Sequence, residues 1–157
     1  MTTTEIRPFR HDDAEATAQV YFDSVRQGTR VYYDDAQRRA WAPARPDLSG
    51  WRERLASQTA FVAERNSRVV GFMTLKADGC IDLAYVAPDA IGQGVAKALY
   101  DAILAEAVRR GIPRLHADAS HLARAFFERQ GWLVVTAQTV TRGGVAIPNF
   151  VMEKTLP

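Results

Sequence analysis

Hydrophobic and polar positions in the first third of the chain predict one strand followed by helices. Residues 6–10 have the pattern of a short strand, and from about residue 12 to 28 apolar residues recur at helical spacing. Residues 32–51 are less regular, since they mix aromatic residues with proline and glycine. They hold a short helical patch at 35–41, before a second helix near 48–57. Irregular aromatic segments often line ligand sites, which makes this one a candidate for substrate contact.

The rest of the chain has the pattern of strands mixed with two further helices. Residues 61–64 and 69–76 are β-rich runs around a polar turn, and a third run at 80–86 follows a turn that contains glycine. Beyond them the pattern predicts a long helix at 95–110, a strand at 114–119, a helix at 121–130, and a hairpin of strands at 132–141 and 146–154. We expect one α/β (α+β) domain over residues 1–157.

Composition agrees with a single domain. With 157 residues and 47% hydrophobic residues, the chain can bury one substantial core. Its 20 basic and 18 acidic residues are interleaved, which argues against nucleic-acid binding, and most of the basic residues are arginine, which suits phosphate or carboxylate. The single cysteine, Cys80, excludes an intrachain disulfide and fits the cytoplasm. No apolar run approaches the roughly 20 residues of a membrane span, and no signal peptide is evident.

A glycine-containing loop between a strand and a helix predicts an anion site. The segment Pro88-Asp-Ala-Ile-Gly-Gln-Gly-Val-Ala96 leads into the helix at 95–110, whose first backbone N–H groups and dipole can converge on a phosphate. It is not a Walker A loop, because Lys97 is followed by Ala98, nor a dinucleotide fingerprint, which needs glycine where Lys97 stands. The alternative interpretation is an ordinary turn at the start of a helix.

This loop resembles the pyrophosphate motif of the Gcn5-related N-acetyltransferase (GNAT) family. That motif is Gln/Arg-x-x-Gly-x-Gly/Ala after a strand that ends in aromatic-Val-x-Pro. The chain has Tyr85-Val-Ala-Pro88, then Gly94 and Ala96 at the right spacing, with Ile91 where the family has Gln or Arg.

Two further segments strengthen the resemblance. The run from Ser120 to Trp132 is similar to the family's final helix motif in order and spacing. Upstream, Tyr32-Tyr33 and the segment around Trp41, together with the closing strand from Pro148, are similar to the bacterial YafP-like subgroup.

The resemblance implies a single-domain GNAT fold. Its central sheet is mixed and mostly antiparallel, with about six to seven strands, flanked by about four helices and splayed between the fourth and fifth strands. The splay opens a slot for the pantetheine arm of acetyl-coenzyme A (acetyl-CoA), where backbone N–H groups near Tyr85 and Val86 hold the thioester carbonyl. The residues that the resemblance assigns to the cofactor are Tyr85, Val86, Ile91, Gly92, Gln93, Gly94, Val95, Ala96, Lys97, Ser120, Ala123, Phe126 and Phe127.

Catalytic candidates follow from the same resemblance. Asp82 is the leading general base, acting directly or through a water; the alternative is a solvent-facing strand residue or a structural partner. The family's usual acid is a Tyr on the last helix, but Phe127 stands there, so protonation of the thiolate falls to water or to a hydroxyl such as Tyr85 or Ser120. We interpret Phe126 and Phe127 as packing residues, one of them lying against the pantetheine.

The acceptor site is expected at the aromatic segment and the closing hairpin. Tyr32, Tyr33 and Trp41 are predicted to form an aromatic wall that attracts a cationic amine, unless they close the core over the open end of the sheet. Subgroup resemblance adds Asn149. A ladder of His, Asp and Ser on one strand at 116–120 cannot form a hydrolase triad, and the histidine spacing does not suit a metal.

Two functions stay open at this point. The first is acetyl-CoA-dependent transfer of an acetyl group, or a longer acyl group, to a primary amine of a small molecule or a protein. The second is a catalytically weak coenzyme A-binding module with a sensing or partner-binding role, which Ile91 and Phe127 favour. Release of free thiol distinguishes them. A homodimer is expected from family habit alone.

Overall fold

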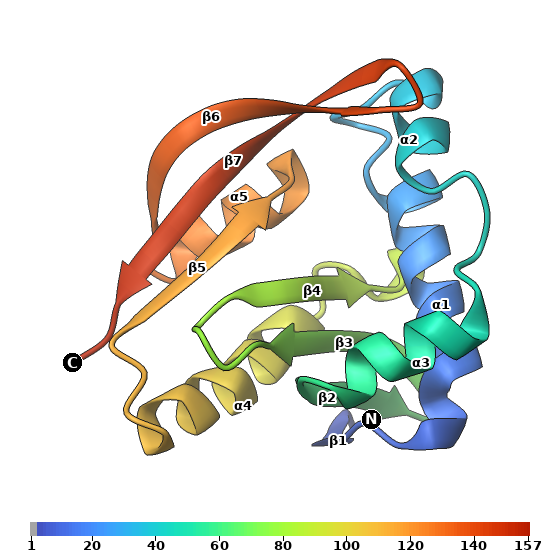
Figure 1. Cartoon of the computed structure of the whole chain (residues 1–157). Helices are drawn as coiled ribbons and strands as arrows, with labels where there is room; N and C mark the ends of the chain where they lie inside the picture. The colour runs from blue at the N-terminus through green and yellow to red at the C-terminus, as the bar shows by residue number, and fades with distance from the viewer. Residues whose placement is uncertain (1–2) are drawn as a thin grey trace.

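The computed structural model describes residues 3–157 and has the predicted order of strands and helices (Figure 1). The strands are β1 (Glu5–Pro8), β2 (Thr59–Arg65), β3 (Arg68–Leu75), β4 (Ile81–Val86), β5 (Arg114–Ala119), β6 (Leu133–Arg142) and β7 (Val145–Thr155). The α-helices are α1 (Ala14–Asp23), α2 (Asp35–Trp41), α3 (Leu48–Ala56), α4 (Val95–Arg109) and α5 (His121–Arg129). A π-helical turn, Ser24–Gly28, continues α1, and 3-10 turns at His11–Asp13 and Pro88–Ala90 precede α1 and α4.

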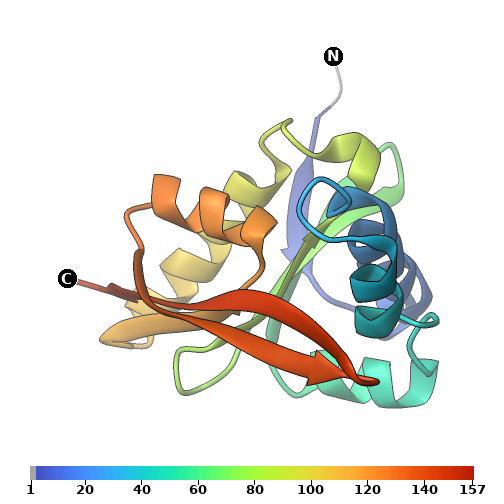
Figure 2. The same cartoon turned by 90° about the horizontal axis from the view of Figure 1, so that it is seen from above.

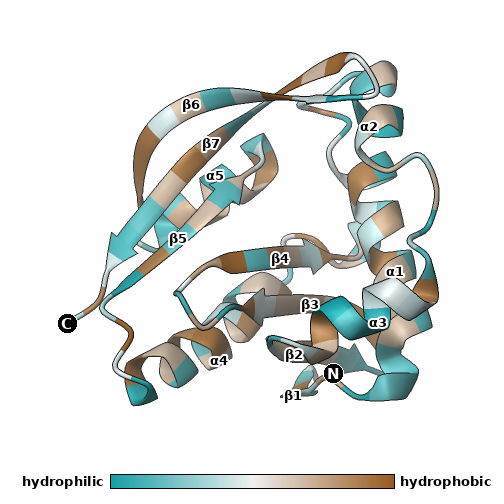
Figure 3. Ribbon diagram, in the orientation of Figure 1, coloured by the Kyte–Doolittle hydropathy of each residue, from teal (hydrophilic) through white to brown (hydrophobic). Residues whose placement is uncertain are grey.

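The strands form two antiparallel sheets instead of one continuous sheet. The first has the order β1-β2-β3-β4, and its β2–β3 turn uses Asn66 and Ser67 at positive φ, 52° and 61°. Helix α4 covers one face of this sheet, whereas α1 and α3 cover the other, as Figure 2 shows from above. Apolar residues concentrate on β3 and much of β4 (Figure 3). Five α-helices lie in the described residues, in agreement with the sequence pattern, and the shortest of them, α2, is capped by Asp34, which accepts the Gln37 N–H at 2.8 Å.

Close packing against β3 fixes the position of α4. The helix buries an apolar stripe that includes Val95, Leu99 and Ile103 at intervals of four residues. At the crossing point β3 has Gly71, where a Cβ atom would lie only 3.0 Å from Val95 Cγ1 and 3.1 Å from Leu99 Cδ1. The absence of a side chain at Gly71 therefore lets the first turns of α4 lie directly on the sheet, beside the end of β4.

The second sheet has the order β5-β7-β6, so the last strand of the chain lies between the two before it. Strands β6 and β7 form a long hairpin that extends past β5 and reaches α2 (Figure 1). The Tyr33 hydroxyl fastens this hairpin, since it donates to the Pro148 carbonyl at 2.7 Å and accepts the His121 N–H at 3.1 Å. The hairpin tip consequently lies over the open end of the first sheet.

The predicted splay between β4 and β5 is confirmed. Among the described residues a single parallel bridge, Cys80 to His116, joins the two sheets at the start of β4. Beyond it β4 pairs with β3 only, with Val86 opposite Gly71 and Tyr85 opposite Phe72. One edge of β4 is therefore left without a neighbouring strand along most of its length.

Candidate active site

The loop before α4 presents backbone N–H groups to the surface. Gly92 and Gly94 have φ of 81° and 84°, in the left-handed region that favours glycine, and a Cβ atom on either would meet open space. Gly94 is the N-cap of α4, and Ala98 is the first residue whose N–H bonds into the helix, to the Gly94 carbonyl at 3.1 Å. The N–H groups of residues 95–97 thus have no partner within the helix, and they point toward the loop with the positive end of the helix dipole.

A cavity of about 340 Å³, named here the loop cavity, opens beside these N–H groups. It contains most of the residues that the sequence assigned to a cofactor. These are Tyr85, Val86, Ile91, Gly92, Gly94, Val95, Ala96, Lys97, Ser120, Ala123 and Phe126. Its lining is predominantly apolar, while the helix start supplies a polar end, so the arrangement fits a long ligand with an anionic part and a less polar arm.

Two of the predicted cofactor residues lie elsewhere. The exposed Gln93 side chain donates to the Asp89 carbonyl at 2.9 Å and accepts from Arg65, away from the loop cavity. Phe127 is 2% exposed and packs on Trp132, with ring centroids 4.3 Å apart, so it belongs to the core. It does not line the loop cavity and instead lines a second cavity, described next. Only its neighbour Phe126 faces the loop cavity.

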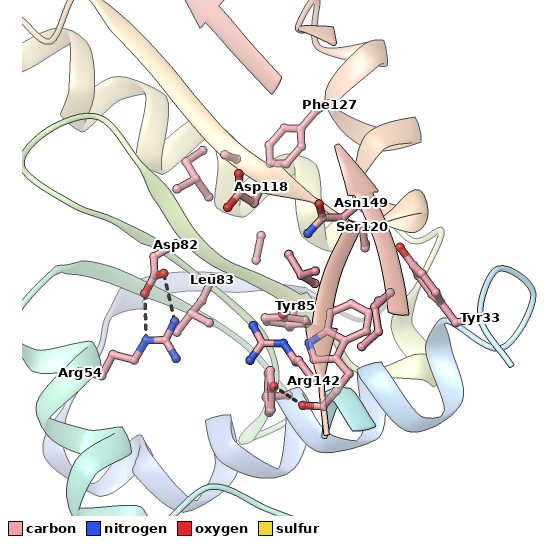
Figure 4. A pocket seen from close by; sticks show the side chains of 17 residues that line it. Tyr33, Arg54, Asp82, Leu83, Tyr85, Asp118, Ser120, Phe127, Arg142 and Asn149 are labelled. Carbon is pink, nitrogen blue, oxygen red and sulfur yellow. Dashed lines mark hydrogen bonds and ion pairs between the residues drawn. The ribbon is translucent and has the colours of Figure 1, made fainter. Parts of the chain in front are cut away.

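A second cavity, of about 260 Å³, lies in the gap between β4 and β5 under the β6–β7 hairpin, and is named here the gap cavity (Figure 4). In contrast to the loop cavity it is lined by many polar side chains. Asp82, Asp118, Ser120 and Asn149, all noted in the sequence, reach it together with Tyr33 and Trp41. Arg54 from α3 and Arg142 from the hairpin reach it as well, and these two arginines were not predicted.

The two cavities meet at β4. Trp41, Ala84, Tyr85 and Ser120 line both of them. The N–H of Ala87 bonds to β3, at the Val70 carbonyl 2.8 Å away, and the Tyr85 carbonyl also lies on the β3 side, 3.1 Å from where a Gly71 Cβ would stand. Because alternate residues of a strand turn their backbone groups to opposite edges, the Val86 N–H points into the gap. Of the two predicted N–H donors, the structure therefore favours Val86 over Tyr85.

Asp82 lies in the gap cavity but is strongly paired. Its carboxylate accepts two hydrogen bonds from the Arg54 guanidinium, both 3.0 Å long, and one from the Gln58 amide at 2.8 Å. Lys76 Nζ lies 4.0 Å away. Burial opposes ionisation, but these partners outweigh it and hold the pKa of Asp82 below its usual 3.8. Asp82 is thus ionised at neutral pH and anchors α3 to β4.

The two hydroxyl groups predicted to protonate the thiolate, those of Tyr85 and Ser120, differ in their surroundings. Burial raises the pKa of the Tyr85 phenol well above its usual 10.0, so the group stays neutral and is available only as a neutral donor. Its ring packs edge-on against Tyr21, with centroids 4.9 Å apart. Ser120 is the N-cap of α5, where its Oγ accepts the Ala123 N–H at 3.1 Å. This bond leaves the hydroxyl hydrogen of Ser120 free to donate into either cavity.

The structure brings together most of the predicted acceptor residues. Trp41 lines both cavities, and Tyr33 and Asn149 line the gap cavity, although the Tyr33 hydroxyl is occupied by Pro148 and His121. Tyr32 is 44% exposed, stacks on His121 with centroids 5.7 Å apart, and lines neither cavity. Adjacent residues of this turn point in different directions, which the sequence could not reveal.

Residues 3–157 contain no group of three His, Cys, Asp or Glu side chains placed to hold a metal ion. Across the same residues, no helix combines the length and the apolar character that crossing a bilayer requires.

Comparison with known proteins agrees with this geometry. Residues 29–156 match the model of a family described as the acetyltransferase (GNAT) domain. The chain is 32% identical to the uncharacterized N-acetyltransferase YafP of Escherichia coli K12 over 153 residues, which is 98% of this chain and 97% of the relative. The chain therefore belongs to the GNAT family of acetyltransferases.

Solved structures give the same result. The crystal structure of a GCN5-related N-acetyltransferase from Rhodopseudomonas palustris, whose description also reads aminotransferase class II, superimposes with a TM-score of 0.92 and is 36% identical, covering 98% of this chain and 96% of that one. The PaiA N-acetyltransferase of Thermoplasma acidophilum, solved in complex with coenzyme A, shares the fold with a TM-score of 0.80 at 19% identity, covering 98% and 99%.

Proposed function

We propose that this protein transfers the acetyl group of acetyl-CoA to a primary amine, with the cofactor in the loop cavity and the amine in the gap cavity. The observation that carries the proposal is the meeting of the two cavities at β4, where the Val86 N–H faces the gap without a strand partner. A relative of the same fold is described as a complex with coenzyme A, which supports the choice of cofactor.

The residues of the loop cavity fit the cofactor by charge and shape. The N–H groups at the start of α4 and the open backbone at Gly92 and Gly94 would hold the pyrophosphate. The apolar lining, including Ala123 and Phe126, would hold the pantetheine arm. When bound, acetyl-CoA supplies a thioester: the amine nitrogen forms a bond to the acetyl carbon, and the bond between that carbon and sulfur breaks.

Val86 and Asp82 would act on the two charges that develop during transfer, a negative charge on the carbonyl oxygen and a positive charge on the amine nitrogen. The Val86 N–H donates to the carbonyl oxygen as it gains negative charge. Asp82 is a weak base, so it cannot readily deprotonate a free ammonium ion. Asp82 can accept the proton that the nitrogen loses after attack, because the nitrogen is then positively charged and far more acidic. A water can carry this proton from the nitrogen to the Asp82 carboxylate.

Protonation of the departing thiolate would fall to a hydroxyl near the shared wall of the cavities. Ser120 lines both cavities and has a free hydroxyl hydrogen, whereas Phe127 is a core residue with no hydroxyl. Tyr85 lies on the same wall as a neutral phenol and is the second candidate. A thiolate leaves readily, so either hydroxyl or a water suffices.

Thiol release with a panel of small primary amines and peptides tests this proposal. The protein is incubated with acetyl-CoA, free thiol is followed colorimetrically, and the acetylated product is identified by mass spectrometry. We expect release that depends on the acceptor, and Asp82→Asn to lower kcat by about 100-fold, a typical contribution of proton transfer. Tight binding of acetyl-CoA with no thiol release for any amine would favour the coenzyme A-binding module instead.

A further inference from the structure

Arg142 is an arginine without a protein partner at the wall of the gap cavity. It is the last residue of β6, beside the turn at Gly143 and Gly144, and Figure 4 shows its guanidinium turned into the cavity. Its side chain is exposed, and within residues 3–157 the guanidinium makes no hydrogen bond or ion pair, unlike that of Arg54 in the same cavity, which is bound to Asp82. A guanidinium that lines a cavity without a carboxylate is suited to bind one from a ligand.

Of the other charged side chains of the gap cavity, two form an ion pair with one another and a third has no ion-pair partner among residues 3–157. Arg54 and Asp82 neutralise one another through two 3.0 Å hydrogen bonds. Asp118, an exposed residue of β5, lines the cavity and has no ion-pair partner among residues 3–157. The cavity thus offers one positive group on the hairpin and one negative group on β5 to an incoming molecule.

Asn149 adds an uncharged polar group to this set. Its Oδ1 atom is buried and finds no hydrogen-bond partner within residues 3–157, although the residue lines the gap cavity. Buried polar atoms are normally satisfied, so this oxygen is an acceptor that still needs a donor, and the ammonium group of a ligand is a donor of the right kind.

We propose that the acceptor is a free amino acid, whose carboxylate binds Arg142 and whose amino group lies on the side of Asp118 and Asn149. The inference rests on the proposed transfer to an amine and adds the class of the amine. The volume of about 260 Å³ is near the lower end for ligand cavities, which suits a molecule of amino-acid size. Both charges of the zwitterion then meet an unpaired group of opposite sign.

Acid and amide pairs provide the test. The wild-type protein is assayed for kcat/KM with the twenty common amino acids and with the amides of the same amino acids, which lack the negative charge. The amide has the less basic amine, which favours its turnover, so a preference for the acid must come from recognition of the carboxylate. We expect the acid to exceed the amide by at least about 10-fold for the preferred side chain.

Variants of Arg142 test whether this residue causes the preference for the acid over the amide. Arg142→Gln should lower the ratio of acid to amide by about 10- to 100-fold, and Arg142→Lys should restore part of it, because lysine keeps the charge but loses the two-pronged geometry. Arg109→Gln is the matched control, since Arg109 lies at the far end of α4 outside both cavities, and should keep the wild-type ratio. An unchanged ratio in Arg142→Gln, or equal use of acid and amide by the wild type, overturns the inference while the transferase function stands.

Calorimetry keeps the inference testable if no amine is acetylated. The coenzyme A-loaded protein is titrated with each acid and its amide. Binding of an acid at least about 10-fold tighter than its amide, lost in Arg142→Gln, supports the amino-acid site even though the transferase proposal fails. Equal binding of the two, or binding of neither, overturns it.

Discussion

Replacement of Ala96 by glutamate should weaken cofactor binding without weakening the fold. Ala96 is the second residue of α4, is partly exposed and lines the loop cavity. A glutamate in the first turn of a helix is compatible with helical geometry and interacts favourably with the dipole, by about 0.3–1 kcal/mol. The same carboxylate stands where the proposed pyrophosphate binds and would also compete for the N–H groups of residues 95–97.

The size of the binding loss can be worked from Coulomb's law. Unit charges about 6 Å apart repel by about 0.7 kcal/mol at the dielectric constant of water and about 2.8 kcal/mol at an effective value near 20. For an exposed loop facing a doubly charged pyrophosphate, and with salt screening, we expect about 1.5–3 kcal/mol. This corresponds to a dissociation constant about 10- to 100-fold higher for acetyl-CoA.

The assay is calorimetric titration of wild type, Ala96→Glu and Ala96→Gln with acetyl-CoA, together with thermal unfolding. Ala96→Gln has the same length without the charge, so the difference between the two variants isolates repulsion. We expect this difference to shrink as salt is raised and the unfolding midpoint of Ala96→Glu to stay within about 4 °C of wild type. Equal affinity of the two variants would refute a pyrophosphate site at the start of α4.

Two further predictions concern buried and paired polar groups. Trp132 donates its indole N–H to the buried Tyr100 hydroxyl at 3.0 Å, so Tyr100→Phe leaves a buried donor unpaired. This change should lower the free energy of unfolding by about 1–3 kcal/mol and the midpoint of thermal unfolding by about 2–12 °C. An unchanged midpoint would mean that the indole N–H finds another partner. Asp82 has a lowered pKa in the folded state because Arg54 and Gln58 outweigh its burial, so the stability it contributes is fully present above the usual carboxyl pKa and is lost as pH falls through the folded value. In urea unfolding, the advantage of wild type over Asp82→Asn should therefore be constant near neutral pH and shrink below about pH 3.8, and a difference independent of pH would contradict the ion pair.

Local patterns predicted much of the fold because they depend on near neighbours in the sequence. The polar turn at 65–68 was visible from its residues, and the structure has a hairpin there with positive φ at Asn66 and Ser67. The glycine loop before α4 was likewise visible, since the left-handed φ of Gly92 and Gly94 follows from residue type. The order β5-β7-β6 was not predicted, because a strand's period of two shows which faces are buried but not which strand lies beside it.

The site could be predicted only in part for the same reason, since local patterns do not show contacts between segments that are distant in the sequence. Arg54 and Asp82 are 28 positions apart, so their pairing depends on how α3 packs against β4, and nothing in the local pattern distinguishes Arg54 from the other sixteen arginines. Arg142 reaches the gap cavity only because the hairpin crosses over the first sheet. The excess of arginine over lysine was the one available signal, and it indicated anion binding without indicating where.

A crystal structure of the protein with acetyl-CoA tests the central claim most directly. We predict the pyrophosphate on the N–H groups at the start of α4, the pantetheine between β4 and β5, and the thioester carbonyl oxygen within about 3.1 Å of the Val86 nitrogen, a normal hydrogen-bond length. The acetyl group should then point into the gap cavity. A thioester that lies away from Val86, or an acetyl group that cannot be reached from the gap cavity, would contradict the account.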